Sequence, residues 1–511
     1  MDSASEQSEK NATVVDTIQE SQIDVAAQFT STKAAPLDPE TALRLRRKID
    51  WHLMPLMCIM YLMTFADKTT LGQSAILGII PGAHLTQTDF NWLGSVFYIS
   101  YLVFQYPQNL ALQRYPVGKW MAINIFCWSI VLLCHAACSS FAGLVVVRLL
   151  LGVFEGAVTP GFMIVTSMFY TRAEQTKRTG YWFLTNGIAV IFLGFVSFGL
   201  AHTNTPNFMP WQWLMIITGI ITLGTAVLFW FFFPDNPTTA YFLTPEERVL
   251  AVERIKVNQT GLENKHWKRE QFIETLQDPK VWVMALFAAV ANIINSLTNQ
   301  RQLIVSQFGF TPIQTTLLGC VDGIAQILAV WSAVTISATS VGRAGAAVIA
   351  FFPGLLGALL VILLPSNLKV GLLFGYWLAI FSVAPFSVFL GWVSGIVSGH
   401  TKRITTNAIV LIFYSIGNFA GPFVWKKQYQ PRNRVPWELL AASMGASAIL
   451  LLILRSMLAA ENKRREREQH DDTFDDVYVT HIEDGKEVRK KVEKEFLDLT
   501  DLQNRDFRYI L

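Results

Sequence analysis

The sequence predicts an all-α polytopic membrane protein whose twelve transmembrane helices form two six-helix bundles. Three features of the sequence support this fold class. Among 511 residues, 52% are hydrophobic and only 15% are charged, whereas about 25% of residues are charged in soluble domains. Apolar stretches of about 20 residues, the length that crosses a bilayer, recur along the chain. A polar interval divides these stretches into two groups of six.

Each group of apolar stretches gives one predicted bundle by the length rule. The first six predicted spans are 52–80, 89–112, 119–137, 139–164, 180–201 and 211–233. The second six are 281–300, 312–334, 344–364, 369–391, 404–425 and 435–458. Between the groups, "LTPEERVLAVERI" has Thr244 before Pro245 and acidic residues in the next turn, which is a typical helix start. We expect this segment to form a surface helix in a linker.

The remaining segments complete the expected organisation. Residues 1–48 lack the apolar core of a signal peptide and are expected to form a disordered cytoplasmic segment. The first bundle then covers 49–233, a cytoplasmic linker 234–280 and the second bundle 281–458. Residues 459–511 are expected to form a solvated cytoplasmic tail with some helical charge pairing.

Lys and Arg in the short loops predict the orientation, because these residues gather on the cytoplasmic side. They occur before the first span, in the loops after spans 2, 4, 8 and 10, and after the last span. The loops 81–90 and 201–212, on the opposite side, contain neither. The loop "WKKQYQPRNRVPW" breaks this pattern: it is either a basic mouth that attracts anions or, as we favour, a tolerated exception. Both termini are therefore expected in the cytoplasm.

Charged residues inside the predicted spans are the main functional signal, because a charge at the bilayer centre costs about 2.5–3.5 kcal/mol. The first span carries Asp67 and Lys68 in "MTFADKTTLG". The fourth carries Arg148 and Glu155, whose spacing places them within about 20° on one helix face. Asp67 can neutralise Arg148 from a facing helix and leave Lys68 or Glu155 for other work. A locked ion pair is the structural alternative.

The chemistry of these four groups points to an ion-coupled anion carrier. Lys68 and Arg148 can hold an anion, the first as a point charge and the second as a planar fork. Asp67 and Glu155 can take up protons, because burial and neighbouring charges change the proton affinity of a carboxyl group. Asp322, an acid in span 8 with no obvious basic partner, is either a further proton site or a helix–helix contact.

Neutral polar residues in spans 7 and 11 are further candidates for substrate binding. They are Asn292, Asn295, Asn407, Tyr414 and Asn418. These side chains could line a cavity, although hydrogen bonding between helices is the commoner reason for such residues in a membrane. Both interpretations remain open at this stage.

The composition argues against several other function classes. A net charge of +3 is too small to indicate a nucleic-acid partner. The five cysteines follow no metal-binding or disulfide pattern, and no metal or cofactor is expected. No nucleophile or His-rich constellation indicates an enzyme. The expected partners are a small organic anion, protons and the lipid bilayer, and the chain is expected to be a monomer.

Several motifs resemble those of the major facilitator superfamily, and more narrowly those of the fungal allantoate permease group of anion:cation symporters. The segment "RLLLGVFEGAVTPGF" is similar to the fourth-span signature of these symporters, and "HTKRITTNAIVLIFYSIGNFAGPFVW" resembles their span 11. The segments "FGFTPIQTTLLGC" and "EKEFLDLTDLQNRDFRYIL" resemble the allantoate permease group in particular. The similarity runs from about residue 48 through 458 and into the tail.

The resemblance implies the major facilitator fold, with two six-helix bundles around a central cavity, alternating access and import of an organic anion with protons. It also implies that coupling and substrate binding involve Asp67, Lys68, Arg148 and Glu155. Lys68 stands where relatives usually have Arg, which weakens the expectation of a bidentate grip on a carboxylate. Gln113 also departs from the superfamily pattern, in the loop after span 2.

The expected function is a secondary active transporter that imports a small carboxylate by proton symport. Allantoate, a ureido acid, nicotinate or another vitamin-like acid are the candidate substrates. The alternatives are an exporter or antiporter of an organic acid, and a non-transporting nutrient sensor. Span 5 lacks the Gly-Pro of many antiporters, and the tail is short for a sensor. The plasma membrane is the expected location.

Overall fold

The computed structural model describes residues 38–203, 208–256, 267–468, 477–483, 486–492 and 497–511. Most of the expected N-terminal segment 1–48 therefore lies outside the described residues. Its last part contradicts the expectation of disorder, because the first helix, α2, spans Pro39–Ile76. The Asp38 side chain accepts a hydrogen bond from the Thr41 amide and caps this helix.

The first half of the chain forms one helical bundle, as the sequence predicts. Its helices are α2, α3 (Ile79–Gly82), α4 (Gln87–Arg114), α5 (Val117–His135), α6 (Phe141–Glu155), α7 (Val158–Phe169), α8 (Arg172–Ala201) and α9 (Pro210–Phe232). The predicted fourth span is interrupted between Glu155 and Val158, where Gly156 and Ala157 separate α6 from α7. Glu155 thus lies at a break in a helix rather than in the middle of one.

The second half forms the other bundle. It contains α12 (Pro279–Ile293), α13 (Ser296–Asn299), α14 (Arg301–Gln307), α15 (Pro312–Ser337), α16 (Gly342–Leu363), α17 (Lys369–Ala379), η3 (Ile380–Val383), α18 (Ala384–Ile396), α19 (His400–Ala420), η4 (Gly421–Val424), η5 (Lys427–Tyr429) and α20 (Arg434–Arg465). The predicted seventh span is also interrupted, after Ile293. Interrupted helices expose backbone groups, which a membrane protein tolerates where they face protein or a cavity.

The twelve-helix fold class is confirmed. Eleven helices among the described residues are long and apolar enough to cross a membrane. The remaining predicted span, α4, has 28 residues but carries polar side chains that are buried, including Gln105 and Asn109. Gln108 of α4, for example, donates to Asn124 of α5 at 2.8 Å. These side chains contact neighbouring helices instead of lipid, which reconciles the polar sequence with a position inside the bundle.

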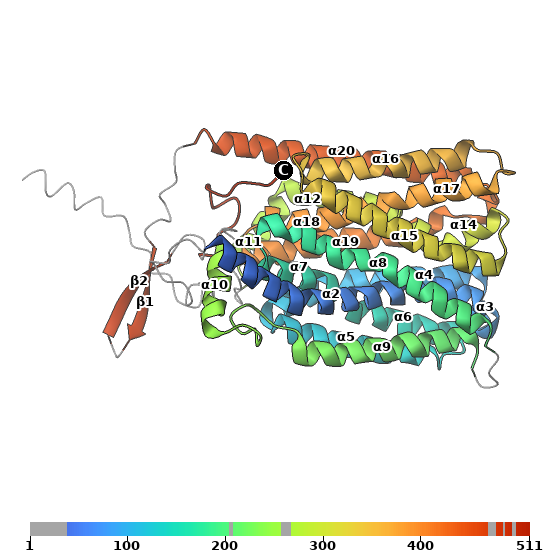
Figure 1. Ribbon diagram of the computed structural model, residues 1–511, viewed down its shortest axis with the longest axis horizontal. Coiled ribbons are helices and arrows are strands. Elements are labelled where there is room, and N and C mark those ends of the chain that lie inside the picture. The colour runs from blue at the N-terminus through green and yellow to red at the C-terminus, as the bar shows by residue number, and fades with distance from the viewer. Residues whose placement is uncertain (1–37, 204–207, 257–266, 469–476, 484–485, 493–496) are drawn as a thin grey trace, which may run out of the picture.

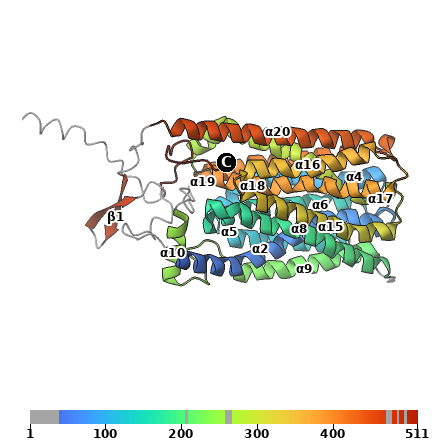
Figure 2. The same cartoon turned by 45° about the horizontal axis from the view of Figure 1, so that its top comes forward.

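The long helices run side by side along the long axis of the molecule (Figures 1 and 2). The linker helices α10 (Pro245–Lys256) and α11 (Arg269–Gln277) lie at one end, on the left in Figure 1, which we call the linker end. The helices α3 and α14 lie at the other end, which we call the far end. The surface helix expected after Thr244 is therefore present as α10.

The tail differs from the solvated segment that the sequence suggested. Helix α20 continues to Arg465, and a hairpin of β1 (Val477–Glu483) and β2 (Lys486–Val492) follows outside the bundle. Residues 497–511 then return to the linker end, where Asp501 and Phe507 are fully buried. Apolar and hydrogen-bonding groups in this last segment find partners on the second bundle, and this explains why it is not solvated.

The two halves meet closely where α8 crosses α15. A Cβ atom on Gly187 of α8 would lie 2.4 Å from the carbonyl oxygen of Gly323 of α15, and a Cβ on Gly323 would lie 2.4 Å from the oxygen of Gly187. Only glycine permits the backbones to approach this closely. Small residues at helix crossings are a general device of membrane proteins.

Gly187→Ala is therefore expected to destabilise the protein by about 1–3 kcal/mol, the usual cost of overpacking. Gly199→Ala on the same helix is the matched control, because nothing lies within 4 Å of a Cβ at that position. The measurement is thermal unfolding of the purified protein in detergent. Equal melting temperatures for the two variants would contradict the close crossing.

Candidate functional site

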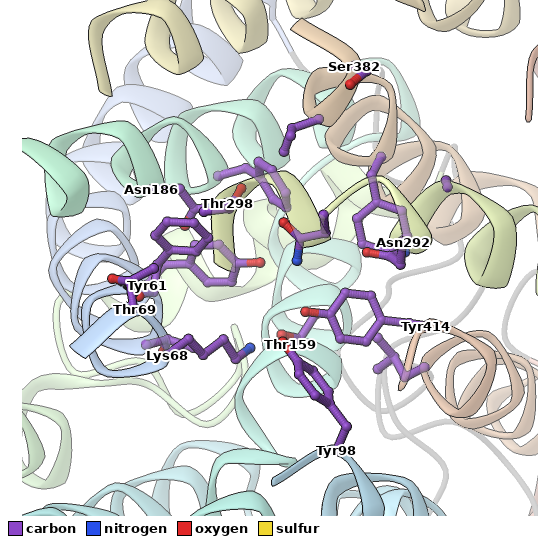
Figure 3. Close-up of a pocket in the computed structure, with 18 residues that line it drawn as sticks. Tyr61, Lys68, Thr69, Tyr98, Thr159, Asn186, Asn292, Thr298, Ser382 and Tyr414 are labelled. Atoms are coloured by element: carbon purple, nitrogen blue, oxygen red, sulfur yellow. Dashed lines mark hydrogen bonds between the residues drawn. The ribbon is translucent and has the colours of Figure 1, made fainter. Parts of the chain in front are cut away.

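A cavity lies between the two halves, near the middle of the bundle (Figure 3). It spans about 780 Å³ of space, which includes open solvent. Its walls come from α2, α4, α7 and α8 of the first half and from α12, α13, η3, α18 and α19 of the second. Among the described residues that line it, Lys68 is the one with a formal charge.

Lys68 separates this cavity from a second hollow. The second hollow shares Lys68, Thr69, Tyr98 and Thr298 with the first, and Arg148 also lines it. In Figure 3, Lys68 extends from α2 into the space beside Tyr98, Thr159 and Tyr414. A cation at this position can reach a ligand in either hollow.

The Lys68 ammonium is held by one carboxylate and three aromatic rings. Its Nζ atom lies 2.8 Å from Glu155 Oε1. The ring centroids of Phe97, Tyr101 and Tyr414 lie 5.9, 5.6 and 5.9 Å away, within the range of cation–π attraction. Glu155 is 1% exposed, so the ion pair is shielded from bulk water and its charges interact strongly.

The pairing of the four charges differs from the sequence expectation. Asp67 was expected to neutralise Arg148, but its carboxylate instead accepts a hydrogen bond from Thr222 of α9 at 3.2 Å. Arg148 is 3% exposed. It forms no ion pair in the part of the chain that the structure describes, where its Nε and Nη2 atoms also lack hydrogen-bond partners. Neighbouring residues on a helix point about 100° apart, so only Lys68 of the first-span pair reaches Glu155.

The neutral candidates separate into two groups. Asn292, Asn295 and Tyr414 line the cavity. Asn418 lies behind them, accepts a hydrogen bond from Asn295 Nδ2 at 2.7 Å and donates to the carbonyl of Tyr414 at 3.0 Å. Asn407 is buried on α19 but is not among the cavity residues. The structure therefore brings three of the five to the cavity surface.

Asp322 has a basic partner that sequence reasoning missed. Arg301 Nε lies 2.8 Å from the Asp322 carboxylate, which also accepts a hydrogen bond from Trp377 Nε1 at 2.8 Å. Arg301 falls one residue beyond the predicted end of span 7, so a search for charges inside the spans does not include it. The pair is buried within the second half, and neither residue is among those that line the two hollows, although Arg301 directly follows Gln300 of the second hollow.

Several polar residues of the cavity were not predicted. They are Tyr61, Thr64, Thr69, Tyr98, Thr159, Asn186, Thr298 and Ser382. Asn186 is an amide inside the apolar fifth span and could have been found by the same reasoning as Asn292. Hydroxyl groups of Thr, Ser and Tyr are common in membrane helices, so the others gave no distinctive signal.

Contacts between the halves close off the linker end. Gln113 Nε2 of α4 donates to Thr401 Oγ1 of α19 at 3.2 Å, and Arg403 Nη1 of α19 donates to Ser167 Oγ of α7 at 3.1 Å. Gln113, which departs from the superfamily pattern, thus still takes part in a contact between the halves. At the far end, the rings of Trp92 and Phe423 meet with centroids 5.8 Å apart.

Comparisons with known proteins agree with this architecture. The sequence profile of the Major Facilitator Superfamily matches residues 57–422. The chain is 33% identical over 482 residues to a thiamine pathway transporter of Saccharomyces cerevisiae, covering 92% of this chain and 87% of the relative. It is 30% identical over 493 residues to the allantoate permease of the same yeast, covering 94% and 88%.

A solved structure shows the same fold at low sequence identity. The proton:xylose symporter XylE, bound to 6-bromo-6-deoxy-D-glucose, superposes with a TM-score of 0.62 at 11% identity, covering 80% of this chain and 96% of XylE. With the apolar helices and the family profile, this makes the chain a multi-pass membrane protein and a transporter rather than an enzyme. The chain belongs to the major facilitator superfamily.

Proposed function

We propose that this transporter imports a small organic anion together with protons by alternating access. The observation that carries the proposal is a buried cluster of two acids and two bases, of which Lys68 lines both hollows and Arg148 lines the second. Three of the four side chains are buried, those of Asp67, Arg148 and Glu155, and Lys68 is partly buried. The formal charges of the four side chains sum to zero. An anion that enters such a balanced cluster leaves one uncompensated negative charge, which a proton can neutralise.

The first step of the proposed cycle is capture of the anion. A carboxylate that enters the cavity competes with Glu155 for the Lys68 ammonium, which lines both hollows. In the second hollow, the guanidinium of Arg148 has donors without a partner in the described residues and can hydrogen-bond the same anion. The asparagine side chains of α12 and the segment after it lie across the cavity and suit amide or carbonyl groups of the substrate.

The second step is uptake of a proton. Once the anion binds the Lys68 ammonium, Glu155 loses its cationic partner in a site closed to bulk water. A buried carboxylate without a partner is costly, so protonation of Glu155 restores charge balance. Asp67, which has a hydroxyl rather than a cation as its direct partner, is the proposed second carrier.

The membrane potential favours more than one proton for each anion. Moving one elementary charge across 100 mV is worth about 2.3 kcal/mol. One proton only cancels the charge of a monoanion, whereas two protons make import electrically favoured when the inside is negative. A cluster with two acids can supply both carriers. Asp322, paired with Arg301, is the next proposed carrier.

The similarity to an allantoate permease supports a carboxylate substrate, and allantoate, other ureido acids, nicotinate and vitamin-like acids are the proposed candidates. We place the protein in the plasma membrane with both termini, and hence the linker end, in the cytoplasm. Uptake of a panel of labelled carboxylates into proteoliposomes, with and without an imposed pH gradient, tests this function. Uptake of none of them, or uptake that ignores the gradient, would count against proton-coupled anion import.

Lys68→Gln is expected to raise the substrate concentration for half-maximal uptake roughly tenfold or more, the cost of losing a charged hydrogen bond. Lys68→Arg should retain most of the activity because the charge is kept. The double variant Lys68→Gln/Glu155→Gln removes both partners of the ion pair and serves as the control for stability. If the double variant recovers the binding of the unchanged protein, Lys68 acts only as the partner of Glu155.

Glu155→Gln is expected to separate exchange from accumulation, because a glutamine imitates the protonated acid and cannot release a proton. The variant should exchange substrate in counterflow at a rate similar to the unchanged protein. In pH-driven uptake, its internal concentration should not rise above the external one. Full pH-driven accumulation would show that the proton travels elsewhere, and Asp322→Asn would then be the variant to measure.

A further inference from the structure

Residues 497–511, which we call the C-terminal strap, bind the linker end of the second half. The buried carboxylate of Asp501 lies 2.6 Å from Lys280 Nζ and 2.8 Å from Lys402 Nζ. Burial alone would raise the pKa of Asp501, but the two lysines hold it well below its usual range. Asp501 is therefore charged at physiological pH and can pair with both lysines.

The strap also binds the turn between α18 and α19. Ser398 Oγ donates to the carbonyl of Leu499 at 2.9 Å. The amide of His400, the first residue of α19, donates to Asp498 Oδ1 at 2.6 Å. An acidic group at this position satisfies a free amide and complements the helix dipole. With the Lys402 contact, the strap holds this turn at every second residue from 398 to 402.

Two other residues in the first turn of α19 contact the first half. Thr401 accepts a hydrogen bond from Gln113, and Arg403 donates one to Ser167. At the start of α19, His400 therefore contacts the strap, and Thr401 and Arg403 contact the first half. The strap fixes this first turn of the helix in the position from which it closes the linker end.

Among the described residues, the strap contacts the first half through Arg172. The guanidinium of Arg172, the first residue of α8, lies 3.8 Å from the ring centroid of Phe507. Arg172 Nη1 also donates to the carbonyl of Arg508 at 3.2 Å. By contrast, Arg465 of α20 donates to the carbonyls of Asp501 and Phe507, each at 2.8 Å, and ties the strap to the second half.

We propose that the C-terminal strap is a latch that stabilises the state closed at the linker end and releases Arg172 whenever that end opens. The strap moves with the second half, because its ion pairs are with Lys280, Lys402 and α20, and with Lys268 beside α11, a helix that packs against α19. Separation of the halves must break the contact of Arg172 with Phe507 and Arg508. The proposal rests on alternating access but not on the identity of the substrate.

Distance measurement between spin labels tests the latch without any transport. Labels are placed at the exposed positions Lys177 on α8 and Glu270 on α11, in a protein whose five free cysteines are replaced by serine. Phe507→Ala should raise the ratio of long to short distances at least about fivefold, the lower end of typical coupling between sites. Because no substrate is added, failure of anion uptake and failure of the latch are separate results.

Arg505→Ala is the matched control within the strap. The ion pairs of Arg505 in the described residues are with Glu461 and Glu468, both in the second half. This variant should leave the distance distribution unchanged. If it shifts the distances as much as Phe507→Ala does, or if a folded Phe507→Ala protein keeps the original distribution, the strap is not a latch. Phe507→Leu, which keeps apolar volume and removes the aromatic face, decides the matter should Phe507→Ala fail to fold.

Discussion

Lys68 and Glu155 form an ion pair in a place where neither charge could remain alone. Leaving one charge of such a pair without its partner costs about 3–5 kcal/mol, so the pair fixes α2 against the break between α6 and α7. The same pair holds Lys68 at the boundary of two hollows. The place of Lys68 at the cavity and the proposed exchange of a carboxylate for Glu155 both depend on this contact.

Balanced burial of charge recurs at the linker end with a different consequence. There, Lys280 and Lys402 converge on Asp501, and the space around them is filled by the strap. At the centre, Lys68 borders both hollows and Arg148 borders the second, and a ligand can enter this space. In both places a buried carboxylate lies against a lysine ammonium. At the linker end the chain itself completes the charge balance, whereas at the centre a transported anion and a proton are proposed to do so.

Span length and polarity were sufficient to predict the fold, because each helix must cross the same bilayer. They could not predict the interruptions at Gly156 and after Ile293, which depend on contacts with neighbouring helices. Sequence reasoning also identified the four central charges, yet it paired Asp67 with Arg148, because choosing partners requires distances between helices. The strap escaped prediction since many of its bonds use main-chain carbonyls, as at Leu499 and Arg508, which leave no trace in residue type.

Helix α19 connects the cavity to the linker end. Its first turn carries Thr401 and Arg403, which contact the first half, and the same helix carries Tyr414, whose ring lies 5.9 Å from the Lys68 ammonium. Thr401 and Tyr414 lie on one continuous α-helix, in which each residue rises about 1.5 Å. A rigid-body displacement of α19 that separates Thr401 from Gln113 would also change the position of Tyr414 relative to Lys68. Helix α19 thus takes part both in the cavity and in the contacts at the linker end. A ligand that alters the surroundings of Lys68 acts on the same helix that the strap binds.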